Sequence, residues 1–226
     1  MFKCFRNYTP FIYKLIIFGI LPFAIIAGEV AMVIYIPFLP YEYKKSINTF
    51  MRFQAMCPMA MVYTIVIADV MVFKGIFSKE NRFEAFIILS EEGKKVVKKT
   101  ILEDAILKNI MILLSVVILL VISVNLVPDM YTLTGFRVKN GISLAFHSIL
   151  LTQVGTWVVR HFLNWTHLLW VMSLLYTVFV PLVMGMSLWD MSAKVLVWQA
   201  FWALMATALN VITINKKVKK NWSRDY

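Results

Sequence analysis

The sequence predicts an all-α, polytopic integral membrane protein with six transmembrane helices and one amphipathic cytoplasmic segment. Composition is the first reason: 61% of the 226 residues are hydrophobic and only 15% are charged, and the mean hydropathy is +0.76. Soluble domains are about 45–50% apolar and about 25% charged. The composition therefore excludes a disordered chain, a secreted disulfide scaffold and an ordinary cytosolic enzyme.

The pattern of the apolar residues is the second reason. They fall into six runs, each near the length of about 20 residues that a membrane helix needs. The sequence contains no internal repeat and no linker long enough to separate two domains, so residues 1–226 are expected to form a single membrane domain. The six predicted spans cover about residues 15–36, 53–73, 106–127, 142–159, 168–188 and 195–214.

Individual runs carry their own signals. The first run passes Ala24–Ala27, which loosely resembles a signal-peptide cleavage site, but it continues to Ile36 and is then long enough to span. A retained helix is therefore favoured over a cleaved leader. In the second run, Cys57-Pro58 indicates a kink. The fourth run is the weakest, because three polar residues interrupt it: His147, Gln153 and Thr156.

The distribution of basic residues is the third reason, and it predicts the orientation. If the N-terminus is cytoplasmic and the spans alternate, 17 of the 23 Lys and Arg residues lie on the inner side, among them Lys108 and Arg160. Such an excess is what the positive-inside rule describes. Both termini are therefore predicted to be cytoplasmic, and the net charge of +11 is explained without a nucleic-acid partner.

One long cytoplasmic segment, residues 75–105, joins the second and third predicted spans. Phe83, Phe86 and Ile87 fall at i, i+3 and i+4, which gives a short helix one apolar face. Ser90 can cap a second helix, in whose first turn two glutamates suit the helix dipole. That helix carries four lysines, which suit an anionic inner leaflet, and it continues into the third span. The segment either orients the third span or docks a cytoplasmic partner.

The order of features in this segment resembles that of ABC-2-type exporter permeases, of the small bacterial class that exports peptides and drugs. In that family a polar turn is followed by an aromatic-rich stretch, a break and a basic helix. Residues 77–86, Leu89-Ser90 and residues 94–97 are similar to that order. Ser90 stands where the family commonly has proline. The resemblance covers this segment and the topology.

The resemblance implies the transmembrane subunit of an ATP-driven exporter, working as a homodimer or with a second permease chain in the bacterial cell membrane. It also implies that the segment binds a separate cytoplasmic ATP-binding subunit. The chain has no Gly-x-x-x-x-Gly-Lys-Ser/Thr, Gly-x-Gly-x-x-Gly or His-Glu-x-x-His motif, so we expect no catalytic residue, metal site or cofactor. An apolar or amphipathic peptide, drug or lipid would suit Met-rich, aromatic walls. The residues implied in docking are Arg82, Phe83, Phe86, Ile87 and Leu89.

Two carboxylates interrupt the apolar spans, where ionisable residues usually mark a pathway or a pairing. Glu29 lies deep in the first span beside Gly28 and is a pathway candidate, with Gln153 of the fourth span as a polar partner. Asp69 lies near the end of the second span, about a turn from Lys74. That position predicts that its side chain snorkels toward the inner interface.

Other function classes stay open. A membrane-embedded enzyme could use Cys57 and His147, although nothing in the sequence orients the histidine. A haem protein could use His147 and His161, but two haems need four axial ligands and the chain has three histidines. A structural or assembly subunit of a larger membrane complex would also suit a compact, basic chain without catalytic motifs.

Overall fold

The described part of the chain is helical. The computed structural model describes residues 11–35, 38, 61–62, 64–69, 90–126, 138–162 and 192–223. These residues contain no strand, which confirms the predicted all-α class. The named elements, in chain order, are α2 (Phe11–Leu15), the π-helical turn η1 (Ile16–Ile20), α3 (Leu21–Tyr35), α7 (Glu91–Leu126), α9 (Val138–Phe162) and α11 (Ala193–Ser223).

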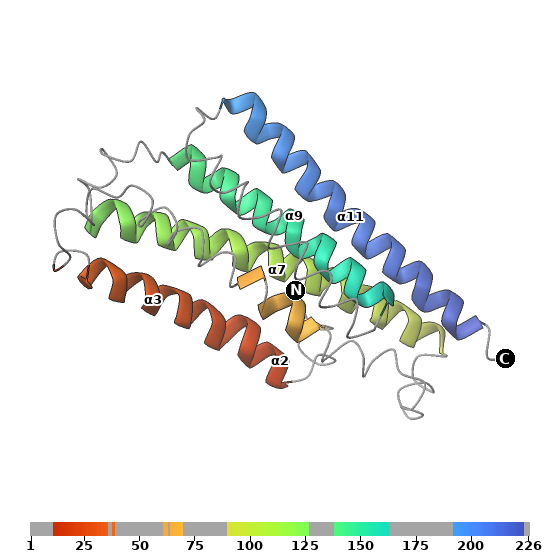
Figure 1. Ribbon diagram of the computed structural model, residues 1–226. Coiled ribbons are helices and arrows are strands. Elements are labelled where there is room, and N and C mark those ends of the chain that lie inside the picture. The colour runs from red at the N-terminus through yellow and green to blue at the C-terminus, as the bar shows by residue number, and fades with distance from the viewer. Residues whose placement is uncertain are drawn as a thin grey trace.

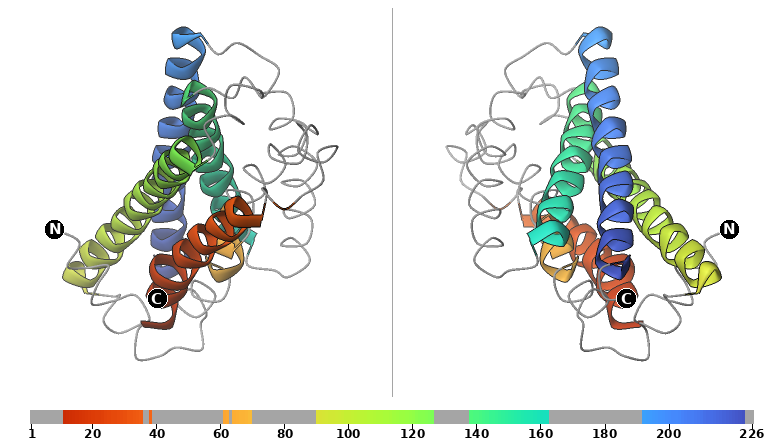
Figure 2. Two further views of the ribbon diagram at one scale, coloured as in Figure 1. Left: turned by 90° about the vertical axis from the view of Figure 1, so that its left-hand side faces the viewer. Right: turned by 90° about the vertical axis from the view of Figure 1, so that its right-hand side faces the viewer.

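The helices pack together in a bundle (Figure 1), in which α7 is inclined to α11 (Figure 2). The run from α2 to α3 and helix α7 point in one direction, and α9 and α11 point in the opposite direction (Figure 1). Helix α11 lies along α9 (Figure 2), α9 packs on α7, and α7 packs on α3. Helix α9 is central, because 56% of residues 141–161 are buried, against 11% of residues 193–216 in α11.

The first predicted span is a continuous helix that contains one π-helical turn. It begins at Phe11, earlier than predicted, so that Lys14 lies within the helix rather than before it. Turn η1 ends at Ile20, two residues before Pro22, which is the second residue of α3. Proline has no N–H to donate to the preceding turn, and π-turns are a common way to absorb such an irregularity. The helix continues to Tyr35.

The second predicted cytoplasmic helix and the third predicted span form one helix, α7. The backbone N–H of Gly93 donates to Ser90 Oγ at 2.9 Å, which confirms Ser90 as the N-cap. Glu91 and Glu92 occupy the first turn as predicted. With 36 residues, α7 is about 54 Å long at 1.5 Å per residue. It is therefore longer than the hydrocarbon core of a bilayer, about 30 Å, is thick.

Three helices of the described part are long and apolar enough to cross a membrane: Phe11–Gly28, Gly141–His161 and Ala193–Lys216. They correspond to the first, fourth and sixth predicted spans. The third predicted span lies within α7. Of the second, only residues 61–62 and 64–69 are described, and the fifth lies outside the described residues. The count of six spans therefore stays a prediction.

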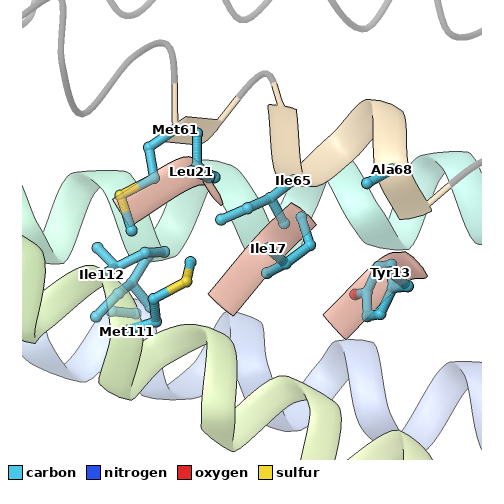
Figure 3. Packing of buried hydrophobic residues seen from close by; sticks show 10 residues of the cluster. Tyr13, Ile17, Leu21, Met61, Ile65, Ala68, Met111 and Ile112 are labelled. Atoms are coloured by element: carbon cyan, nitrogen blue, oxygen red, sulfur yellow. The ribbon is translucent and has the colours of Figure 1, made fainter. Parts of the chain in front are cut away.

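A small apolar core holds the first helix to its neighbours. Tyr13, Ile17 and Leu21 recur every four residues along the first helix and are buried. They lie between the helical residues of the 61–69 region and α7 (Figure 3). The side chains that they meet there include Met61, Ile65, Ala68, Met111 and Ile112.

Candidate functional site

Five ionisable side chains from four parts of the chain meet inside the helix bundle. At most 1% of each residue is exposed. We call this group the ion-pair cluster. Its members are Tyr13 of α2, Asp69 at the end of the helical residues 64–69, Asp104 and Lys108 of α7, and Arg160 of α9.

Arg160 binds both carboxylates of the cluster. Its Nε donates to Asp69 Oδ2 at 2.5 Å, and its Nη2 donates to Asp69 Oδ1 at 2.8 Å. The same Nη2 lies 2.5 Å from Asp104 Oδ2. A bidentate contact of this kind fixes the orientation of the guanidinium as well as its distance. Arg160 therefore joins α9 to α7 and to the segment that carries Asp69.

Lys108 and Tyr13 complete the cluster. Lys108 Nζ lies 2.5 Å from Asp69 Oδ1 and 2.9 Å from Asp104 Oδ2. Tyr13 Oη donates to Asp104 Oδ1 at 2.8 Å, and the ammonium group of Lys108 lies 5.5 Å from the centre of the tyrosine ring, within cation–π range. All four carboxylate oxygens thus have a donor, and two negative charges face two positive charges.

Helical spacing explains how α7 contributes two opposite charges. Asp104 and Lys108 are four residues apart, so they lie on the same face of α7. Ile101, Ala105 and Ile112 are also buried on this side. Tyr13 is the first residue of the buried row along the first helix, and Arg160 lies in the last turn of α9. The core packing therefore brings the five side chains together.

A second layer of polar contacts links α7, α9 and α11 beside the cluster. Gln153 Nε2 donates to Asn109 Oδ1 at 2.8 Å, and Gln153 Oε1 accepts from Asn210 Nδ2 at 2.7 Å. Asn210 Nδ2 also lies 3.0 Å from Thr156 Oγ1. Asn109 Nδ2 in turn donates to Thr207 Oγ1 at 3.0 Å. Amide contacts of this kind hold helices together inside a membrane.

The contact between Asn109 and Thr207 fixes the relative depth of α7 and α11, which run in opposite directions. At 1.5 Å per residue, exposed Lys99 lies about 15 Å from Asn109 along α7, and exposed Lys216 lies about 14 Å from Thr207 along α11. Both distances point to the same end of the bundle. The nearest exposed apolar side chains, one turn closer to the centre, are Leu102 and Ile212.

Lys99 and Lys216 mark a boundary between basic and apolar exposed side chains. The ion-pair cluster lies on the apolar side of this boundary. Asp104 is five residues and Lys108 nine residues past Lys99. They therefore lie about 8 and 14 Å farther along α7 than Lys99, toward the centre of the bundle. Charges are expensive at such depth unless they are paired. The complete pairing of the cluster is therefore what allows four charged groups to be buried.

This arrangement is suited to holding helices together rather than to catalysis or metal binding. Each carboxylate oxygen is already occupied by an ammonium, guanidinium or hydroxyl donor. Among the residues that the structure describes, no group of three or more His, Cys, Asp or Glu is placed to hold a metal ion. Because removing one member would leave an unpaired buried charge, the cluster resists rearrangement.

Three sequence-based expectations are wrong. Asp69 does not snorkel toward Lys74: it is fully buried and binds Lys108 and Arg160, because opposite charges within the bundle offer closer partners than the interface. Arg160 and Lys108, counted as inner-side loop residues, are buried within α9 and α7 for the same reason. The side of the membrane on which each basic residue lies stays a prediction.

The other predicted site residues divide into described and undescribed ones. Gln153 is buried and bonded to asparagines on two helices. Glu29 lies in α3, and its side chain is outside the described part. His147 Nδ1 lies 2.9 Å from the Ser143 carbonyl of its own helix. His161 stacks on Trp157. Cys57, Arg82, Phe83, Phe86, Ile87 and Leu89 lie outside the described residues.

Sequence reasoning missed the cluster as a unit, although two signals pointed to it. Asp69 and Arg160 are charges of opposite sign within or beside apolar runs, and intramembrane charges usually pair with one another. Asp104 and Lys108 form an i, i+4 pair directly before the third apolar run. Tyr13 gave no signal, because its role depends on tertiary packing.

Comparison with protein-family models, with curated proteins and with solved structures finds no match.

Proposed function

We propose that this chain is the membrane subunit of an ATP-driven exporter of an apolar or amphipathic substrate, energised by a separate ATPase. It works as a homodimer or with a second permease chain in the bacterial cell membrane. The observation that carries this proposal is α7, one uninterrupted helix from Glu91 to Leu126 that Ser90 caps. It joins the predicted docking segment, residues 83–89, to the ion-pair cluster.

The geometry of α7 suits transmission of a movement. Its N-terminus follows the docking segment directly. Asp104 fastens α7 to the first helix and to α9, and Lys108 fastens it to Asp69. A displacement of the cytoplasmic end would therefore move several helices together, since no hinge separates that end from the cluster. Tightly paired charges suit a rigid block of this kind.

The directions of the helices support the six-span topology. Helices α3 and α7 point the same way, and so do α9 and α11 (Figure 1). Between the members of each pair, the chain must return to the end from which it started. The predicted second span, residues 53–73, and the predicted fifth span, residues 168–188, supply these two returns.

The docking prediction is tested by purification of the tagged protein from its native membrane. We expect an ATP-binding protein to co-purify with the wild type. Phe83→Ala with Phe86→Ala should abolish this co-purification while membrane insertion is kept, because each buried phenylalanine contributes at most about 1.5–3 kcal/mol to an interface.

The matched control is Phe11→Ala with Phe23→Ala, since these two phenylalanines are 72% and 74% exposed on the first helix. This variant should retain the ATPase. Absence of an ATPase from the wild-type preparation, or equal recovery with the docking variant, would contradict the proposal and leave an assembly subunit as the better description.

The topology is tested by labelling single cysteines in intact cells. A cysteine placed at Tyr226 should be protected from an impermeant reagent, and one placed at Arg137 should react, because the basic residues favour cytoplasmic termini. Labelling of the cell-lysate controls must show that both cysteines can react. External reaction at position 226 would refute the six-span arrangement.

A further inference from the structure

We propose that exposed lysines at one end of the bundle form a binding site for the headgroups of anionic phospholipids. We call them the basic rim: Lys95 and Lys99 of α7 and Lys216 of α11. The proposal concerns the lipid environment of the chain and holds whether or not an ATPase is its partner.

The exposed side chains along the outer face of α7 change from basic to apolar. Lys95 and Lys99 are one turn apart on the same face, and both are exposed. Farther along the same face, the exposed side chains are apolar over several turns. They include Leu102, Ile110, Leu113, Val117 and Val121. A face of this kind has its lysines at the level of lipid headgroups when its apolar part lies in hydrocarbon.

The exposed side chains of α11 change from apolar to basic at the same depth. From Lys194 to Lys216 its exposed side chains are mainly apolar, over about 33 Å at 1.5 Å per residue. That length matches the hydrocarbon core of about 30 Å. Because Asn109 contacts Thr207, the lysine that ends this apolar face lies at nearly the same level as Lys99. Two independent helices therefore mark one boundary.

The lysines at this end of α7 differ in how exposed their side chains are. Lys94 already pairs with Glu91 at 2.9 Å, and this contact lowers the pKa of the Glu91 carboxyl. Lys95 and Lys99 point to the exposed side of the same turns. Flexible lysine side chains beside an apolar surface can reach phosphate oxygens while their methylene groups remain against the acyl chains. An anionic headgroup is thus a better ligand than a zwitterionic one.

The test is native mass spectrometry of the delipidated protein, titrated with phosphatidylglycerol or phosphatidylcholine of identical acyl chains. We expect the wild type to bind phosphatidylglycerol more tightly. Lys95→Gln with Lys99→Gln should raise the Kd of the first phosphatidylglycerol about 25-fold, because each lysine contributes about fivefold near an anionic surface. The affinity for phosphatidylcholine should not change.

The matched control is Lys139→Gln with Lys194→Gln. It removes two exposed lysines near the N-termini of α9 and α11, at the end of the bundle away from the basic rim. This variant should bind phosphatidylglycerol like the wild type. Inorganic phosphate at the same concentration should not compete, since it lacks the acyl chains that the apolar face requires. Equal wild-type affinity for the two lipids, an equal loss in the control, or competition by phosphate would each overturn the proposal.

Discussion

Replacing Lys108 with methionine is expected to leave little folded protein after extraction into detergent. The substitution keeps most of the side-chain volume but leaves two buried carboxylates facing one guanidinium. Removing one partner of a buried ion pair costs about 3–5 kcal/mol, a large share of the roughly 5–15 kcal/mol by which folded proteins are stable. Size-exclusion chromatography and the thermal unfolding midpoint measure the loss.

The second arm of this experiment removes one charge of each sign. Asp104→Asn with Lys108→Met leaves the neutral pair of Asp69 and Arg160, which retains two hydrogen bonds. This double variant should recover most of the lost stability, because neutral replacement of a buried pair is often tolerated. Lys95→Met, at an exposed position of α7, is the matched control. A Lys108→Met midpoint equal to that of this control would show that the cluster is not a stabilising unit.

The sequence was sufficient for features that depend on local pattern. The cap at Ser90, the helix that follows it and the apolar helices around residues 142–159 and 195–214 all arise from spacing within one stretch of chain. This is why the structure confirms these helices, although α11 continues to Ser223, nine residues beyond the predicted end of the last span.

The ion-pair cluster could not be predicted in the same way, because its contacts join residues far apart in sequence. Tyr13 and Asp104 are 91 positions apart, and so are Asp69 and Arg160. Counting charges by position assigned Arg160 to a loop, since a lysine or arginine just past an apolar run normally lies there. Only the packing of α9 against α7 shows that its guanidinium turns inward instead.

Inserting two alanines between Lys95 and Val96 is expected to abolish export while the protein stays folded. Every buried side chain from Thr100 onward keeps its register, so the ion-pair cluster should form normally. The residues before the insertion, however, turn by about 200° relative to the cluster, because each helical residue adds about 100°. If α7 transmits the movement of an ATPase as a rigid rod, the docking segment then faces the wrong way. The measurement is export per co-purified ATPase, expected to fall at least about tenfold, which corresponds to about 1.4 kcal/mol.

A four-alanine insertion at the same place is the control for this rod-like coupling. It lengthens the helix more, by about 6 Å, yet turns the docking segment by only about 40° relative to the cluster. We therefore expect the longer insertion to retain more export than the shorter one, an order that a simple spacer effect would reverse. The unfolding midpoints of both variants should match the wild type, because Asp104, Lys108 and Arg160 keep their partners. Equal export by the two variants would mean that α7 does not carry the coupling, and the rigid-rod mechanism would have to be abandoned.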